Sequence, residues 1–280
     1  MTATGMRSPP APTPRTHVGD LLRDWRSVRR LSQLDLALAA DVSSRHLSCV
    51  ETGRAQPSRD LVSRLAQTLE LPLREQNTLL VAAGYAPEYS ETALTAPEMA
   101  TARKAIELIL NKQDPYPGIV MNRHWDLLMA NESTERIFRW LLDGPPAQSN
   151  IMKTFFDPLG VRPYVVNWEE CAGDLIRHLH NDLAAAPSDA RMAQLMRDVL
   201  AYPDVPQRWA RRQLPAPVPS LSTITYRKGD VDLTFFWTMA TFGTPHDVSL
   251  DELRIECSFP ADDATARFCS ELAASSPTAG

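Results

Sequence analysis

The segment that begins at Ser32 constrains the fold of this chain more than any other part of the sequence. Ser32 and Asp35 are three residues apart, the spacing at which two side chains cap the first turn of a helix reciprocally. A second helix is expected to begin at Ser43, a favourable N-cap, and to stop before Gly53, which is favourable just after a helix. Asp41 falls in the turn between them, where the backbone often needs a positive φ that aspartate tolerates. Two short helices joined by such a turn form helix-turn-helix geometry.

Apolar residues recur at helical spacing both before and after this segment, which predicts three further short helices. Pro72 separates the last two of these helices, and Gly84 ends the last one. We therefore expect an all-α domain over residues 17–86. The proline-rich stretch 1–16 is predicted to be a disordered tail.

Charge is distributed unevenly along the chain, whose formal net charge is −5. The stretch 15–86 contains ten arginines and no lysine against eight acidic residues, so this part is mildly basic, whereas the remainder is acidic. The negative total argues against a protein that coats nucleic acid through bulk charge. The basic front is compatible with a local contact to nucleic acid, although charge alone is weak support for it.

The helix-turn-helix segment resembles the phage-repressor-like, XRE-type family. The residues that carry the resemblance are Ser32, Gln33, Ala37, Val42, Ser43, Glu51, Thr52, Gly53, Arg54, Pro57 and Ser58. The family implies that the helix from Ser43 enters the major groove of double-stranded DNA. By position, the residues expected at phosphates or near the DNA backbone are Gln33, Ser43, Ser48 and Arg54. The residues expected at base edges are Ser44, Arg45 and Cys49.

The same resemblance implies further features of the domain and leaves one alternative open. Arg26 and Glu51 are placed to form an ion pair between the first and third helices. A single domain of this kind covers little DNA, so useful sequence specificity implies a homodimer on a two-fold-related site. The alternative is a helical bundle that uses these residues only for packing and solvation.

The rest of the chain predicts a second domain of another class. After a linker at 87–99, short strands lie at both ends of residues 100–272 and helices lie in the middle, which indicates an α+β domain. Apolar residues alternate from Val231 to Met239, as expected for a strand with one buried face. The final stretch, 273–280, is expected to be a tail.

Longer motifs in both parts of the chain are similar to MmyB-like transcription regulators. They are RHLSCVETGRAQPSRDLV at 45–62, YPGIVMNRHWDLLMAN at 116–131 and FGTPHDVSLDELRIECSFPADDATA at 242–266. The resemblance covers roughly residues 17–270 and is looser over 143–220. It implies a PAS-like fold for the second domain and a sensor role, with a small apolar ligand of acyl or fatty-acid type.

Ligand sites are mostly apolar cavities with a few fixed polar groups. On that basis the candidate ligand-binding residues are Asn122, Arg123, Trp125, Phe155, Phe235 and Trp237. The alternative for each aromatic residue is ordinary core packing, since aromatic side chains at strand spacing usually belong to the core.

The sequence shows no catalytic constellation, and we expect a protein that is not an enzyme and has no catalytic residue, cofactor or metal. Glu170, Asp174 and His178 would share one stripe of a helix, but no second element supplies further metal ligands, so a solvated face is favoured. Four widely spaced cysteines favour a reducing, cytoplasmic setting. No apolar run approaches the length of a membrane helix, so no membrane partner is expected.

Three functions follow from these expectations. The first is a sequence-specific transcription regulator that senses a small ligand. The second is an operator-binding protein whose C-terminal domain only dimerises or docks another protein. The third is an enzyme fused to a DNA-binding module, which the missing acid, base and nucleophile set disfavours.

Overall fold

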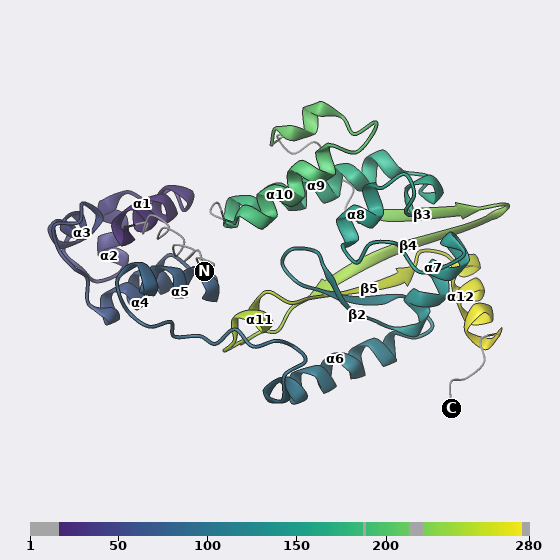
Figure 1. Ribbon diagram of the computed structural model, residues 1–280, viewed down its shortest axis with the longest axis horizontal. Coiled ribbons are helices and arrows are strands. Elements are labelled where there is room, and N and C mark those ends of the chain that lie inside the picture. Colours follow the sequence, from purple (N-terminus) through teal and green to yellow (C-terminus); the bar gives the residue numbers. More distant parts are fainter. Residues whose placement is uncertain (1–16, 187–188, 213–220, 276–280) are drawn as a thin grey trace, which may run out of the picture. The chain divides into compact units, whose positions relative to one another are not determined.

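The computed structural model describes residues 17–186, 189–212 and 221–275, which divide into two compact units (Figure 1). The first ends at Ser90 and the second begins at Glu91; we call them the N-terminal and C-terminal units. The expected tail at 1–16 lies outside the described residues. The expected tail at 273–280 lies outside them only from residue 276, because the last helix continues to Ser275 through alanines that favour a helix.

The N-terminal unit consists of five helices. They are α1 (Val18–Val28), α2 (Gln33–Ala39), α3 (Ser44–Glu51), α4 (Arg59–Thr68) and α5 (Leu73–Ala82). Ser32 and Asp35 form the predicted capping box, and Ser43 caps α3 by accepting a hydrogen bond from the His46 amide. Asp41 has the expected positive φ, of 50°. The local boundary signals in the sequence therefore predicted this part of the fold correctly.

Helix α1 approaches the end of α3 very closely, and Gly19 makes this approach possible. A Cβ atom at Gly19 would lie 2.5 Å from the carbonyl oxygen of Glu51 and 2.6 Å from that of Val50. Both atoms belong to the backbone, so any side chain here would push the two helices apart. Leu22 of α1 and Leu47 of α3 are fully buried in the shared core. The position of α3 is thus set by direct backbone packing against α1.

The C-terminal unit contains one antiparallel sheet of five strands in the order β2-β1-β5-β4-β3. The strands are β1 (Gly118–Met121), β2 (Leu127–Ala130), β3 (Thr223–Lys228), β4 (Val231–Ala240) and β5 (Arg254–Pro260). The hairpin of β3 and β4 follows the predicted positions. Strand β5 inserts between β1 and β4, so chain segments from both ends of the unit meet at the centre of the sheet.

Helices cover both faces of this sheet. The helices are α6 (Ala100–Gln113), α7 (Glu132–Leu142), α8 (Ile151–Phe156), α9 (Trp168–Ala185), α10 (Ala190–Leu200), α11 (Val248–Asp251) and α12 (Asp263–Ser275). Figure 1 shows α6 on one side of the sheet and α9 and α10 on the other. Helix α8 lies in the stretch 143–220, where the family resemblance is looser. The expected fold class, an all-α unit followed by an α+β unit, is confirmed.

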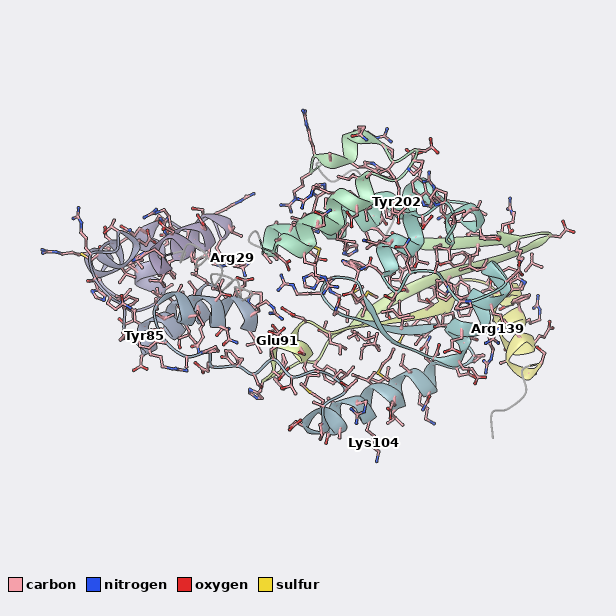
Figure 2. All side chains as sticks on the ribbon, in the orientation of Figure 1. Arg29, Tyr85, Glu91, Lys104, Arg139 and Tyr202 are labelled. Atoms are coloured by element: carbon pink, nitrogen blue, oxygen red, sulfur yellow. The ribbon has the colours of Figure 1, made fainter. Side chains whose placement is uncertain are left out.

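The two faces of the sheet belong to separate apolar clusters. Val120 and Ile255 are paired neighbours on the outer face, where they pack against Ile106 and Leu110 of α6. Lys104 lies on the opposite side of α6 and is exposed (Figure 2). The inner face carries the larger cluster, which includes residues from α7, α8, α9 and α10. The inner face therefore carries the main core of the C-terminal unit.

Candidate functional site

Helix α3 has a buried side and an exposed side. Leu47 and Val50 are buried, whereas Ser44, Arg45 and His46 are exposed. Ser44 and Ser48 are four residues apart, as are Arg45 and Cys49, so these two pairs occupy one side of the helix. Ser48 and Cys49 are half-buried at the edge of that side. The structure thus brings Ser44, Arg45 and Cys49, the three residues expected at base edges, onto one side of α3 together with Ser48, which was expected near the DNA backbone.

A buried ionic cluster fixes the C-terminal end of α3. The guanidinium of Arg26 donates to both carboxylate oxygens of Glu51, at 2.8 and 3.1 Å, and Glu51 is only 3% exposed. The hydrogen bond from Arg26 to Glu51 raises the pKa of the guanidinium. This ion pair is the one that the resemblance implied. Its place at the end of α3 makes it a clamp between the first and third helices.

Gln33 contributes to the same cluster, because its side-chain amide donates to Glu51 at 3.0 Å. One of the two N–H groups of the Gln33 amide is therefore already used within the protein, and the other is left to contact a phosphate. Ser43 uses its hydroxyl oxygen to cap α3, which leaves its O–H free to donate. Arg45 and Arg54 are exposed, and among the described residues the side chain of neither has a hydrogen-bond or ion-pair partner.

The C-terminal unit contains a partly open cavity of about 140 Å³ between the inner face of the sheet and helices α7, α8 and α9. Its size is comparable to that of an engineered protein cavity of about 150 Å³ that binds benzene. Trp125, Phe155, Phe235 and Trp237, four of the six predicted ligand residues, line it. Trp125 and Phe235 are each about 1% exposed.

The other two predicted ligand residues do not line the cavity. The side chain of Asn122 bridges the turn between β1 and β2 through hydrogen bonds with Asp126 and the His124 amide. Arg123 forms ion pairs with Asp189 at 2.6 Å and with Glu252 at 2.8 Å. The polar groups of both residues are therefore used within the fold. Asn122 stabilises the turn between β1 and β2, and Arg123 links this turn to Asp189 and Glu252.

Trp125 is held at the wall of the cavity in a strained backbone conformation. Its φ is 64°, a value that is rare for a bulky residue and costs about 1–3 kcal/mol. The indole Nε1 donates to Asp182 of α9 at 3.1 Å, and the guanidinium of Arg254 lies 5.2 Å from the ring centroid. Arg254 also pairs with Asp182 at 2.6 Å. Contacts from α9 and β5 therefore offset the strain and fix this aromatic side chain.

The polar groups of the lining were missed by the sequence analysis. Glu256 of β5 and Tyr226 of β3 both lie on the inner face, and burial raises the pKa of Glu256 to about 7. Burial and the Glu256 carboxylate also raise the pKa of Tyr226. Cys171 of α9 lines the same space, and burial raises the pKa of its thiol to about 12.

The acidic stripe on α9 is only in part the solvated face that was expected: Glu170 and His178 are exposed, whereas Asp174 is half-buried. Asp174 and His178 line the cavity, while Glu170 is exposed. The Asp174 carboxylate pairs with Arg177 and accepts a hydrogen bond from the Ser222 hydroxyl at 2.7 Å. Within the described ranges, no group of three or more His, Cys, Asp or Glu side chains is arranged to hold a metal ion.

Two matches to protein families agree with this arrangement. Residues 102–272 match the MmyB-like transcription regulator ligand binding domain, which is more than half of the chain, and residues 17–79 match a helix-turn-helix domain. The chain belongs to the MmyB-like transcription regulators. No curated protein matches the chain.

Membership in the MmyB-like family assigns a role to each unit. The helix-turn-helix unit binds DNA, and the C-terminal unit is a ligand-binding domain, so this MmyB-like protein is a DNA-binding transcription regulator. Both families are domains of transcription regulators rather than of enzymes. Within the described residues, no helix is both long enough and apolar enough to cross a membrane.

Proposed function

We propose that this MmyB-like regulator reads a specific operator with the exposed side of α3 and senses a small apolar ligand in the cavity of its C-terminal unit. The observation that carries the first half is the position of Arg45, an exposed arginine on a helix held by the Arg26–Glu51 clamp. Arginine pairing with guanine is the commonest specific contact in the major groove. The cytoplasmic location expected from the sequence stays a prediction.

The proposed roles of the other residues follow from their exposure. Ser44 and Cys49 share the side of α3 with Arg45 and face base edges in this proposal. Ser43, Ser48 and Arg54 contact or approach phosphates. Gln33 contributes one amide N–H to a phosphate while the other remains on Glu51. A homodimer places two copies of α3 in successive major grooves, about one helical turn apart.

Arg45→Ala is expected to remove most of the preference for the operator over random DNA. A bidentate arginine–guanine contact discriminates by about 1–3 kcal/mol, or roughly 5- to 150-fold per half-site. The measurement begins with selection of the preferred site from a random duplex library by the wild-type protein. Affinities of both proteins for the selected and a scrambled duplex are then compared at one salt concentration. The selected site should contain two symmetric half-sites.

The matched control is Arg54→Ala, which removes an exposed arginine proposed to contact a phosphate. This variant should weaken binding to both duplexes by similar factors, because phosphate contacts carry no sequence information directly. If Arg45→Ala weakens both duplexes equally, Arg45 is a phosphate contact and the proposed reading side of α3 is wrong.

Sensing is supported by the apolar cavity, and it requires that a ligand bind two states of the protein differently. Ethylbenzene, an apolar molecule close to the cavity in size, is expected to bind and to change the affinity for the selected duplex at least fivefold. Titration calorimetry measures the first effect, and fluorescence anisotropy with labelled duplex measures the second.

Leu175→Phe serves as the control, because Leu175 lines the cavity from α9 and a larger side chain there fills it. The variant should retain DNA binding and lose the response to ethylbenzene. Binding of ethylbenzene without any change in DNA affinity would count against sensing and favour a docking role for the C-terminal unit.

A further inference from the structure

Glu256 places a carboxyl group in the wall of the largely apolar cavity. It sits at the centre of the inner face, paired across the sheet with Ile119 of β1 on one side and Met239 of β4 on the other. Among the described residues, no hydrogen bond or ion pair reaches its carboxyl group. Glu256 is half-buried and lines the cavity. A carboxyl group that is partly shielded from water and has no partner is costly, so its presence here needs an explanation.

The other polar groups around the cavity do not neutralise this carboxyl. Asp174 is satisfied by Arg177 and Ser222, and the Cys171 thiol donates to the Thr223 carbonyl oxygen. His178 is exposed at the edge of the cavity. In the described part of the chain, no lysine or arginine lines the cavity. The charged or titratable groups that line the cavity with Glu256 are thus one further carboxylate, a tyrosine, a thiol and one histidine.

Arg254, the nearest arginine along β5, is directed to another partner. It lies two residues from Glu256 on the same face of the sheet, but both arms of its guanidinium donate to Asp182, at 2.6 and 3.0 Å. Its guanidinium carbon also lies 5.2 Å from the centroid of the Trp125 ring. This arginine therefore stabilises Asp182 and Trp125 at the cavity wall, and it does not pair with Glu256.

Aromatic side chains line the same cavity as this carboxyl. Tyr226, Phe235 and Trp237 share the inner face with Glu256, and Trp125 and Phe155 line the cavity from other elements. The face of an aromatic ring attracts cations, most strongly for tryptophan, and the attraction grows when water is excluded. An unpaired carboxyl among aromatic rings is a combination that suits a positively charged head group on an apolar body.

We propose that the cavity binds a small apolar amine, whose ammonium group pairs with Glu256 and whose hydrocarbon body lies against the aromatic side chains. This proposal rests on the proposed function, because it takes the cavity to be the ligand site. A carboxylate ligand of the same size, such as a short acyl chain with its acid group, would place two negative charges together in a space that no cation lines. The charge of the lining thus selects between two apolar ligands of equal size.

The test compares three ring-sized probes by titration calorimetry with the full chain at pH 7.5. They are benzylamine, its uncharged counterpart ethylbenzene, and benzoate. Benzylamine is expected to bind at least tenfold more tightly than ethylbenzene, and benzoate is expected to bind more weakly than both. Glu256→Gln should abolish the advantage of benzylamine while leaving ethylbenzene binding unchanged, which also shows that the cavity remains folded.

Glu135→Gln is the matched control, because Glu135 is exposed on α7 and does not line the cavity. It should bind all three probes as the wild type does. Equal binding of benzylamine and ethylbenzene, or tighter binding of benzoate, would overturn the amine proposal while leaving the sensing function intact. Failure of ethylbenzene itself to bind would overturn both.

Discussion

Replacing Arg26 with methionine is expected to lower the free energy of unfolding of the N-terminal unit by about 3–5 kcal/mol. The substitution leaves the Glu51 carboxylate 3% exposed, with only the Gln33 amide to accept from. A buried charge that loses its partner is far more costly than the loss of an exposed ion pair. Urea unfolding of the full chain, followed by the circular dichroism of its helices, measures the change.

Two variants test whether the effect comes from the buried charge. Arg54→Met removes an exposed arginine and should change the free energy of unfolding by less than about 0.5 kcal/mol. The double substitution Arg26→Met with Glu51→Met removes both charges and should destabilise much less than Arg26→Met alone. If the double variant is instead as unstable as the sum of the two single variants, the cost is lost packing and the clamp is not ionic.

This clamp also connects stability to the proposed DNA recognition by α3. Glu51 is the last residue of α3, and its backbone carbonyl accepts a hydrogen bond from Arg23 at 2.7 Å. The same end of α3 lies directly against Gly19 of α1. The side of α3 that is proposed to read DNA therefore belongs to a helix whose other side and C-terminal end are fixed to α1.

The second large effect is a dependence of stability on pH. Glu256→Gln should be more stable than the wild type, and the difference in their free energies of unfolding should grow as the pH rises from 5 to 8. The pKa of Glu256 is raised from its ordinary value of 4.5 to about 7 in the folded protein. Between these two values the folded state binds more protons than the unfolded state, so stability falls as the pH increases. Below about pH 4.5 the cost is absent, and above about pH 7 it is fully present.

The difference between these pKa values corresponds to a loss of roughly 3 kcal/mol at most in the free energy of unfolding at high pH. Thermal unfolding of the ligand-free wild type and Glu256→Gln, at pH 5 and at pH 8, measures it. For a unit of this size each kcal/mol shifts the melting temperature by about 2–4 °C. Glu135→Gln should track the wild type at both pH values. Equal stabilisation by Glu256→Gln at pH 5 and pH 8 would show that the carboxyl does not titrate in this range.

The N-terminal unit was predictable in detail because its boundaries depend on local chemistry. The capping box of Ser32 and Asp35 involves groups three residues apart, and Ser43 caps α3 with its own hydroxyl. The positive φ of Asp41 is likewise a property of one turn. Such interactions are written in short stretches of sequence, so no knowledge of distant residues was needed to place them.

The cavity was predicted only in part. The apolar alternation along β4 identified Phe235 and Trp237, which do line it. The sequence offered Asn122 and Arg123 as its polar groups, but both are used in contacts with Asp126, Asp189 and Glu252. Asp189 and Glu252, the partners of Arg123, lie more than 60 residues away from it along the chain, so spacing within one motif could not reveal these contacts. Asn122 instead bonds within its own turn, to Asp126 and the His124 amide.

Sequence alone determined the two-part organisation, the helix-turn-helix and the strand that carries Glu256. In that strand the apolar residues Ile255 and Cys257 alternate with Arg254, Glu256 and Ser258, a pattern that ordinarily assigns the polar side to solvent. Only the tertiary structure decided otherwise: β5 enters the middle of the sheet, and α7, α8 and α9 cover its polar side. Alternation shows that a strand has two different faces, whereas the packing of distant helices determines which of them is enclosed.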